Sequence, residues 1–259
     1  MTGQTRWAWA SGHLEVTNVV LAPDIDVVKA LLPAGLSLAP QTLTPAGTHP
    51  VVLMFGQHSN VHPWFQPPSS GGHYNEWIVA TPCLEWRGNG LVKPCAYMSR
   101  LYLNSLYYVF LGWLYGYPKK LSKSMVTPSS YDVRTFPGNQ PRVSMTNAPA
   151  GPVTPFPSMP GHEAIASVFE LPFFQRLGPM PWLASRMWFE LETATVQPMT
   201  ANFSINTGCA PGLPAMSKQV GSITNGIPGA FHLSCDWMLS RPFLAKNIPQ
   251  GFYGTNPPA

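Results

Sequence analysis

Apolar residues in this chain occur in short runs separated by segments rich in proline and glycine. Residues 15–21 and 51–56 are two such runs, with the length and the content of Val, Leu and Phe that single β-strands have. The chain holds 30 prolines and 22 glycines, spread throughout, and these residues interrupt helices and central strands. The pattern therefore predicts short, mostly β elements joined by irregular connections.

The first half of the chain carries signals for two helices and a hairpin. Residues 23–33 begin and end with proline, which predicts a short helix. A strand-like run at 74–86, a turn at 87–90 and a further apolar run from Leu91 predict a β-hairpin. Residues 104–121 fit a helix that Pro118 bends or ends.

The remaining segments are predicted to be strands and loops. Loops are expected at 58–73, which is rich in Pro, Gly, Ser and His, and at 137–160, which holds seven prolines. Strands are expected at 164–169, 187–196 and 199–205, and a strand that leads into a terminal helix is expected at 231–246. No repeat, heptad pattern or change of composition marks a second domain, so we predict one α+β domain over residues 1–259.

Charge and hydrophobicity narrow the classes of partner. Only 10% of the residues are charged and 45% are hydrophobic, so we expect a homo-oligomer that covers part of the apolar surface. The net charge is +4, and the basic residues form no run longer than the segment 119–123. Nucleic acid is therefore not an expected partner.

Cysteine spacing and the N-terminal sequence favour a cytoplasmic protein with reduced thiols. The four cysteines show no CxxC spacing, and no signal-peptide pattern follows Met1. The apolar run 101–117 is 17 residues long and contains Asn104, Ser105 and two glycines, which is short for a membrane span. A buried strand and helix explain this run better, and no membrane association is expected.

Two adjacent lysines, Lys119 and Lys120, follow an aromatic segment with no other charge. Burial and a neighbouring positive charge both disfavour the protonated form of a lysine. A neutral lysine attacks ketones and aldehydes, and the resulting Schiff base draws electrons from the adjacent carbon. Alternatively, the pair caps a helix C-terminus in water, where the helix dipole stabilises cations.

The context of the lysine pair resembles a known family. The segment Gly112-Trp-Leu-Tyr-Gly-Tyr-Pro-Lys-Lys-Leu121 is similar to the stretch Gly-Arg-Glu-x-x-Gly/Ala-Tyr/Phe-Pro-Lys-Lys-Leu of the acetoacetate decarboxylase superfamily. Further similar segments follow the family order, namely 20–36, Tyr74-Asn-Glu76 and 232–241. The likeness spans roughly residues 14–247.

The resemblance implies a fold, a chemistry and a set of residues. The fold is α+β, a single domain with a cone-shaped antiparallel β-barrel or double sheet and a few peripheral helices. The activity is that of a cofactor-independent lyase on a small-molecule carbonyl substrate. Lys119 would form the Schiff base, Lys120 would be the neighbouring charge that keeps it partly neutral, and Glu76 would be an active-site carboxylate. The expected substrate-binding residues are His13, His73, Tyr74, Trp113 and Tyr117.

Several positions that are charged in the family carry apolar residues here. Trp113 and Leu114 stand in place of an Arg-Glu pair, and Leu14 stands in place of a substrate-binding arginine. Leu53 or a neighbour occupies the position of a second carboxylate. These changes predict an apolar keto or polyketide-like substrate rather than a small β-keto acid. Decarboxylation and aldol, dehydration or cyclisation chemistry stay equally open.

Other chemistries were weighed on the same residues. His58, His62, His73 and Glu76 fall within a short span, as metal ligands do, but no HExxH motif or helical face fixes their geometry, and we predict no metal and no cofactor. The chain lacks GxSxG, GxGxxG and GxxxxGKS/T motifs. Two alternatives to the imine remain: a non-covalent cyclase that moves protons with His and Glu76, and a non-catalytic barrel that binds apolar small molecules.

Overall fold

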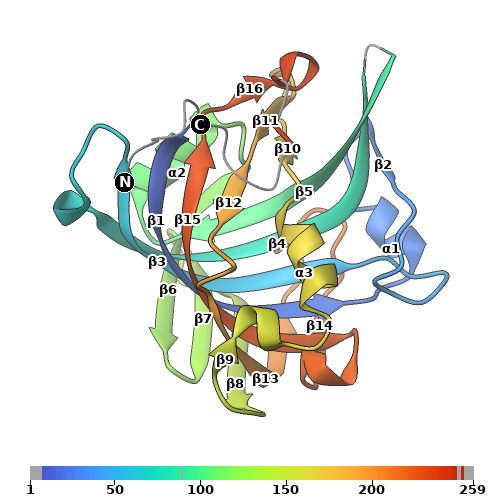
Figure 1. Ribbon diagram of the computed structural model, residues 1–259, viewed down its shortest axis with the longest axis vertical. Helices are drawn as coiled ribbons and strands as arrows, with labels where there is room; N and C mark the ends of the chain where they lie inside the picture. Colours follow the sequence, from blue (N-terminus) through green and yellow to red (C-terminus); the bar gives the residue numbers. More distant parts are fainter. Residues whose placement is uncertain (1–7, 89, 250–251, 254–259) are drawn as a thin grey trace.

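One connected, mostly antiparallel sheet forms the body of the protein (Figure 1), of which the computed structural model describes residues 8–88, 90–249 and 252–253. Strand pairing closes part of this sheet into a ring, because β5 pairs with β4 on one side and with β6 on the other. In ring order its strands are β4 (Gly72–Gly88), β5 (Leu91–Leu103), β6 (Lys119–Thr127), β7 (Ser130–Thr135), β8 (Pro141–Pro149), β13 (Thr195–Ile205), β15 (Gly229–Ser240), β1 (Ala8–Leu21) and β3 (Val51–Pro63).

A second ring shares β15, β1, β3, β4 and β5 with the first. Strand β10 (Phe173–Gln175) pairs with β5 and with β11 (Leu183–Ser185), while β12 (Met187–Phe189) pairs with β15. Only Arg186 separates β11 from β12, so the chain itself closes this ring. The predicted barrel or double sheet is confirmed, although β6 and β10 run parallel to β5 and the sheet is not wholly antiparallel.

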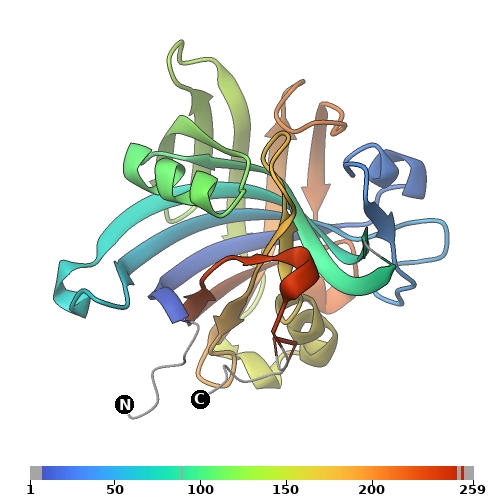
Figure 2. The ribbon, with the colours of Figure 1, turned by 90° about the horizontal axis from the view of Figure 1, so that it is seen from above.

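Helices and short strands complete the described chain. The α-helices are α1 (Ile25–Lys29), α2 (Leu106–Leu114) and α3 (His162–Phe169). The short strands are β2 (Leu36–Leu38), β9 (Thr154–Pro155), β14 (Met216–Val220) and β16 (Phe243–Leu244), and 3-10 turns lie at Pro68–Ser70, Phe156–Ser158, Ile223–Asn225 and Ala245–Asn247. Helix α2 packs beside β5 and β6 and helix α3 beside β12, so the two helices cover different parts of the sheet (Figure 2).

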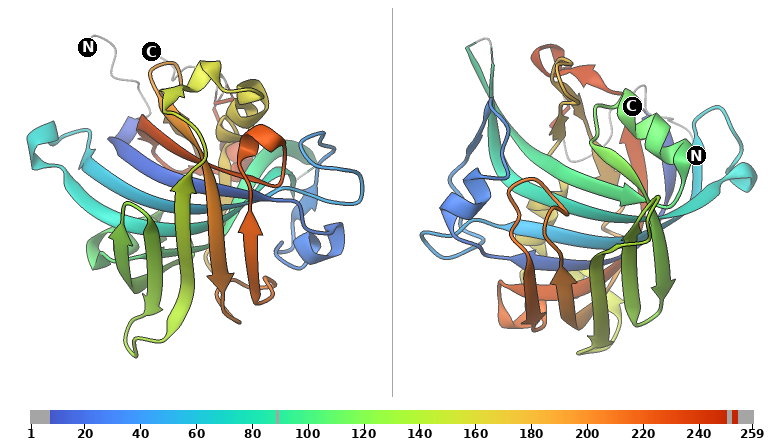
Figure 3. Two further views of the ribbon diagram at one scale, coloured as in Figure 1. Left: turned by 90° about the horizontal axis from the view of Figure 1, so that it is seen from below. Right: turned by 180° about the vertical axis from the view of Figure 1, so that it is seen from behind.

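The shared strands are apolar on both faces, because each ring has its own core. On β4, Trp77 and Val79 belong to the core beside β7, β8 and β13, which run side by side in Figure 3. Tyr74 and Ile78 face the other core, which α2, α3 and β10 cover. Successive residues of a strand point to opposite faces, so β4 lines both interiors.

Several sequence-based predictions of secondary structure are confirmed. The strands predicted at 15–21 and 51–56 lie within β1 and β3, and the helix predicted within 23–33 is α1. β4 and β5 form the predicted hairpin, although residue 89 of its turn lies outside the described residues. The apolar run 101–117 supplies the end of β5 and helix α2, as predicted.

Two predicted segments are wrong in type. Residues 164–169 form helix α3 rather than a strand, because Ile165, Val168 and Phe169 lie at helical spacing and place their side chains on one face. The predicted loop 137–160 contains strand β8. Its prolines stand at both ends of the strand, where they interrupt no ladder.

Other predictions are wrong in extent. The strand predicted at 187–196 is divided between β12 and the start of β13, and the strand predicted at 199–205 belongs to β13. The prediction of a helix at the end of 231–246 is wrong, since β15 is followed by β16 and a 3-10 turn after Pro242. The loop predicted at 58–73 is shorter, because β3 continues to Pro63.

Helix α2 leaves a row of apolar side chains exposed. These are Leu106, Tyr107, Phe110, Trp113 and Leu114. An exposed row of this kind is common at protein interfaces, but the expected homo-oligomer stays a prediction. Within the described residues, no helix is both long and apolar enough to cross a membrane.

Candidate active site

The turn that follows α2 sets the position of Lys119. Gly116 has a φ of +76°, and its N–H bonds to the carbonyl of Trp113 while the N–H of Tyr117 bonds to that of Gly112. This is the Schellman arrangement that ends helices. Pro118 cannot continue the helix, so the chain turns into β6 with Lys119 as its first residue.

The side chain of Lys119 passes directly over helix α2. A Cβ atom on Gly112 would lie 2.1 Å from Cδ of Lys119, so only glycine leaves room for the lysine stem at this point of the helix. From the outer side, Nε1 of Trp113 donates a hydrogen bond of 3.0 Å to the carbonyl of Lys119. The helix therefore fixes both the backbone and the direction of this lysine.

Lys119, Glu76 and His58 form a buried cluster of ionisable groups. Nζ of Lys119 lies 3.2 Å from Oε1 of Glu76, and Nε2 of His58 lies 3.3 Å from Oε2. The three side chains are 10%, 5% and 4% exposed. Strand pairing brings them together, because Glu76 on β4 pairs with Leu103 of β5 and Leu101 of β5 pairs with Lys119.

The charge of Lys119 keeps Glu76 ionised. Burial alone would raise the pKa of Glu76, but the charge of Lys119 and a hydrogen bond from His58 outweigh it, so the pKa is lowered. Oε1 of Glu76 is paired with the Lys119 ammonium. Nδ1 of His58 has no hydrogen-bond partner among the described residues, so this atom is available to a bound molecule or to water.

The cluster opens into a cavity between β1, β3, β4, β10 and β12. Its other walls are mostly apolar and include Leu14, Met54, Ile78 and Trp237. A larger outer pocket is also lined by Lys119. Lys119 therefore lies between the inner cavity and the outer pocket.

Two tyrosines flank the cluster. The ring of Tyr74 stacks on His58 with centroids 4.6 Å apart, and the hydroxyl of Tyr117 lies 2.5 Å from Oγ of Ser185. Nζ of Lys119 lies 5.6 Å and 5.8 Å from the centres of the rings of Tyr74 and Tyr117, within the range of cation–π attraction. Burial raises the pKa of both phenols, so they are neutral.

Lys120 does not reach the cavity. It is exposed and lies on the face of β6 opposite to Lys119, in register with Tyr102 of β5. The charge of Arg100 contributes most to lowering the pKa of Lys120, followed by burial and the charge of Arg142. The structure thus places its charge on the face of β6 that points away from the cavity, contrary to the role expected beside the reacting amine.

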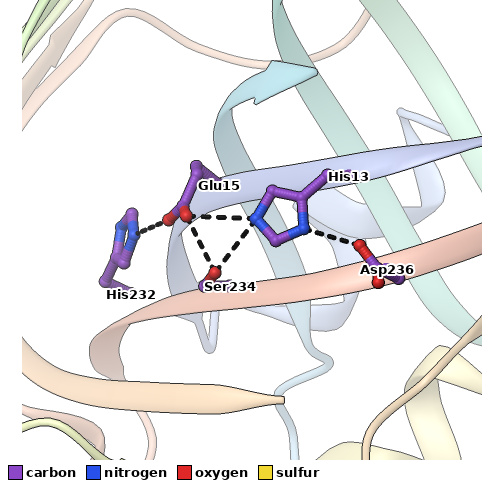
Figure 4. A network of polar contacts seen from close by, with 5 residues as sticks. All are labelled: His13, Glu15, His232, Ser234 and Asp236. Atoms are coloured by element: carbon purple, nitrogen blue, oxygen red, sulfur yellow. Dashed lines mark hydrogen bonds and ion pairs between the residues drawn. The ribbon is translucent and has the colours of Figure 1, made fainter. Parts of the chain in front are cut away.

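His13 belongs to a polar network on the outer face of β1 and β15 (Figure 4). Its Nδ1 lies 2.7 Å from Asp236 and its Nε2 lies 3.2 Å from both Glu15 and Ser234. Glu15 in turn accepts hydrogen bonds from Ser234 and His232. The hydroxyl of Ser234 therefore points to Glu15 rather than to His13, and the network ties two strands together away from the cavity.

The other expected substrate-binding residues are divided. Tyr74 and Tyr117 line the cavity, whereas His73 is exposed and Trp113 is 42% exposed on α2. His73 and His13 alternate with the inward residues Tyr74 and Leu14, so the pleat turns both away from the cavity.

Where the family carries charges, the structure shows apolar walls. Leu14 lines the cavity in place of the arginine. Leu53 faces the other core, and its neighbour Met54 lines the cavity instead.

His58 is the site residue whose role the sequence did not predict. The sequence groups it with His62, His73 and Glu76 as possible metal ligands, and no metal is expected there. In the structure His62 lines the outer pocket, and no group of three or more His, Cys, Asp and Glu side chains suited to a metal occurs among the described residues. His58 joins the cluster through the register of β3 on β4, since it pairs with Tyr74, two residues from Glu76, and no signal within a single segment marks this pairing.

Known structures share this architecture. The chain is similar to the enduracididine biosynthesis enzyme MppR, with 13% identity over 94% of this chain and 92% of that chain and a TM-score of 0.64. It is likewise similar to an acetoacetate decarboxylase from Legionella pneumophila subsp. pneumophila str. Philadelphia 1, with 15% identity, coverage of 94% and 89% and a TM-score of 0.60. The chain has the acetoacetate decarboxylase fold.

Further comparison agrees with that assignment of the fold. An acetoacetate decarboxylase-like enzyme from Sphingomonas wittichii RW1 matches with 14% identity, 91% coverage of both chains and a TM-score of 0.56. No protein-family model matches the chain, and no curated protein matches it. The fold expected from the resemblance is therefore confirmed by the structure. The likeness to these proteins extends to the fold alone.

Proposed function

We propose that the protein is a cofactor-independent lyase that forms a Schiff base between Lys119 and an apolar ketone or aldehyde. The observation that carries the proposal is the pairing of Lys119 with Glu76 at 3.2 Å inside a mostly apolar cavity. A buried lysine next to a carboxylate has both the nucleophile and the proton acceptor that imine formation needs.

The cluster can carry out each proton transfer of that reaction. The Lys119 ammonium gives one proton to Glu76, and the free amine adds to the carbonyl carbon. The carbonyl oxygen takes up a proton from the amine and the proton held by Glu76, and it leaves as water, so that a protonated imine remains. Loss of a proton or of carbon dioxide from the adjacent carbon then gives an enamine. The enamine carbon attacks a second carbonyl carbon or, after decarboxylation, takes up a proton, and either step restores the protonated imine. Addition of water to this imine releases the product and restores the amine.

The charge balance of the cavity favours a neutral substrate. Lys119 and Glu76 neutralise each other, and no arginine lines the cavity where Leu14 stands. A carboxylate on the substrate would be buried without its own partner, which is costly. Aldol, dehydration or cyclisation chemistry on a neutral carbonyl compound therefore suits the cavity better than decarboxylation of a small β-keto acid.

One protein of similar structure supports condensation chemistry. A structure of MppR contains the condensation product of pyruvate and imidazole 4-carboxaldehyde. A protein of this fold thus accommodates a condensation product. That observation supports carbonyl chemistry beyond decarboxylation for the present chain.

Borohydride trapping tests the proposal. The protein is incubated with a neutral ketone, reduced with borohydride and analysed by peptide mass spectrometry. We expect an adduct on Lys119, no adduct in Lys119→Met and an unchanged adduct in Lys120→Met, the matched control. Trapping that persists in Lys119→Met, or that is absent from the unmodified protein, would contradict the proposal.

One observation favours a second function, a non-covalent cyclase. The Lys119 ammonium is paired with Glu76, and His58 contacts the other oxygen of this carboxylate, so Glu76 and His58 can move protons without an imine. In that case Lys119→Met keeps turnover of a cyclising substrate, while Glu76→Gln abolishes it.

A further inference from the structure

A second cavity adjoins the active-site cavity. It is lined by residues of β1, β3, β4, β5, α3 and β10. Met54, Phe173 and Phe189 line both this chamber and the active-site cavity, so the two spaces share a wall. We call this second cavity the apolar chamber.

The walls of the apolar chamber carry no polar side chain. Every residue that lines it is aliphatic, aromatic, Met or Pro. Helix α3 contributes Ile165, Val168 and Phe169 to one wall, and Ala80 of β4 contributes to the opposite one. Cavities with such walls stay dry and bind apolar molecules, and water in the chamber would have no side chain to bond to.

The three adjoining spaces differ in chemistry. The outer pocket includes His62, Gln66 and several tyrosines, the middle cavity holds the charged cluster, and the apolar chamber shares a wall with the middle cavity. Lys119 lies at the boundary between the first two. A molecule whose carbonyl group lies at Lys119 can therefore extend an apolar tail across the shared wall into the chamber.

We propose that the apolar chamber binds the hydrocarbon tail of the substrate, which is a medium-chain aliphatic or aryl-alkyl ketone or aldehyde. Placement of the carbonyl end rests on the proposed Schiff-base function, whereas binding of the tail rests on the chamber alone. Each methylene group transferred from water contributes about 0.8 kcal/mol, so affinity rises about fourfold for each methylene that enters the chamber.

Chain-length series of two ligand classes test the tail and the carbonyl separately. Primary alkanols from butanol to decanol cannot form an imine, and their dissociation constants are measured by calorimetry. We expect the fourfold steps with the unmodified protein, up to the length at which the chamber is full. Methyl ketones from butanone to decanone are trapped with borohydride on Lys119, and we expect the same dependence on length.

Matched variants test whether the fourfold steps in affinity arise from binding in the apolar chamber. Ala80→Leu adds carbon atoms inside the chamber, and Ala164→Leu makes the same change at an exposed position of α3. We expect Ala80→Leu to lose at least tenfold affinity for the longest alkanols while butanol is unaffected, and Ala164→Leu to match the unmodified protein. If Ala80→Leu does not fold, Val168→Phe fills the chamber from α3.

The outcomes separate this inference from the proposed function. Stepwise alkanol binding without an adduct on Lys119 supports the chamber and overturns the Schiff base, leaving a binding protein. An adduct that forms equally with all ketones, together with alkanol affinities that do not depend on length, overturns the chamber and leaves the Schiff base standing. Equal effects of Ala80→Leu and Ala164→Leu would also overturn the assignment of the chamber.

Discussion

Replacing Gly112 with alanine should displace the side chain of Lys119 while changing the stability of the fold only slightly. A Cβ atom at this position would lie 2.1 Å from Cδ and 2.5 Å from Cε of Lys119. Carbon atoms in contact lie about 3.5–4.0 Å apart, so the lysine stem must move by about 1.5 Å to clear the new methyl group. The 3.2 Å contact between Nζ and Glu76 would then lengthen beyond ion-pair distance.

The expected effects on reactivity and stability differ in size. A displacement of about 1 Å at a reacting group costs about 10²-fold in rate, and we expect borohydride trapping on residue 119 to slow by at least that factor. Alanine in place of glycine stabilises a helix by about 0.5–1 kcal/mol, which offsets part of the weakened ion pair. We therefore expect the free energy of unfolding to change by less than about 2 kcal/mol.

Trapping kinetics and denaturant unfolding of Gly112→Ala measure both effects. The control is Leu114→Ala, because Leu114 lies on the same helix and is 54% exposed. Trapping at the unmodified rate in Gly112→Ala would refute the reasoning, since it would show that the lysine can react without crossing the helix at this glycine. A large loss of stability would show instead that the clash is absorbed by the helix.

Two further predictions concern proton transfer and pH. His58→Phe keeps the aromatic stack but removes the contact to the carboxylate, so we expect trapping to slow by about 10²-fold; an unchanged rate would exclude His58 from proton transfer. In the outer network, hydrogen bonds and nearby positive charge lower the pKa of Glu15 from 4.5 to about 2 despite burial, and carboxylate contacts raise that of His13 above 6.5 despite burial. The Glu15 contribution to stability is present above pH 4.5 and lost toward pH 2, whereas the His13 contribution is present below pH 6.5 and lost above its raised pKa. Glu15→Gln should therefore lower the free energy of unfolding by ~1 kcal/mol near neutral pH and leave it unchanged near pH 2. Denaturant unfolding of both proteins across this pH range measures the difference. A difference of the same size near pH 2 would contradict the prediction.

The sequence was informative where local chemistry decides the structure. Apolar runs bounded by Pro and Gly located β1, β3 and the hairpin of β4 and β5. The motif around Lys119 and the acidic residue at Glu76 were paired by resemblance alone, and the structure places them 3.2 Å apart. The period of two along a strand would also have placed His13 correctly, because Leu14 faces the cavity and its neighbour must face out.

What the sequence could not supply depends on pairing between distant strands. His58 reaches Glu76 only through the register of β3 on β4, which no single segment encodes. Lys120 is separated from Lys119 because β6 begins at the pair, whereas a helix through residue 121 would have kept both near one face. Helix α3 was missed because its apolar residues are β-branched or aromatic, as in strands, although their spacing is helical.

The strands shared by the two rings allow one face of the sheet to change independently of the other. On β4 and β1, one set of alternate positions packs into the core beside β7, β8 and β13, while the other set faces the active-site cavity and the core around it. Substitutions on the second set can therefore change the chemistry of the cavity without disturbing the layer that keeps the strands in register. A fold of this kind can be shared with MppR at 13% identity.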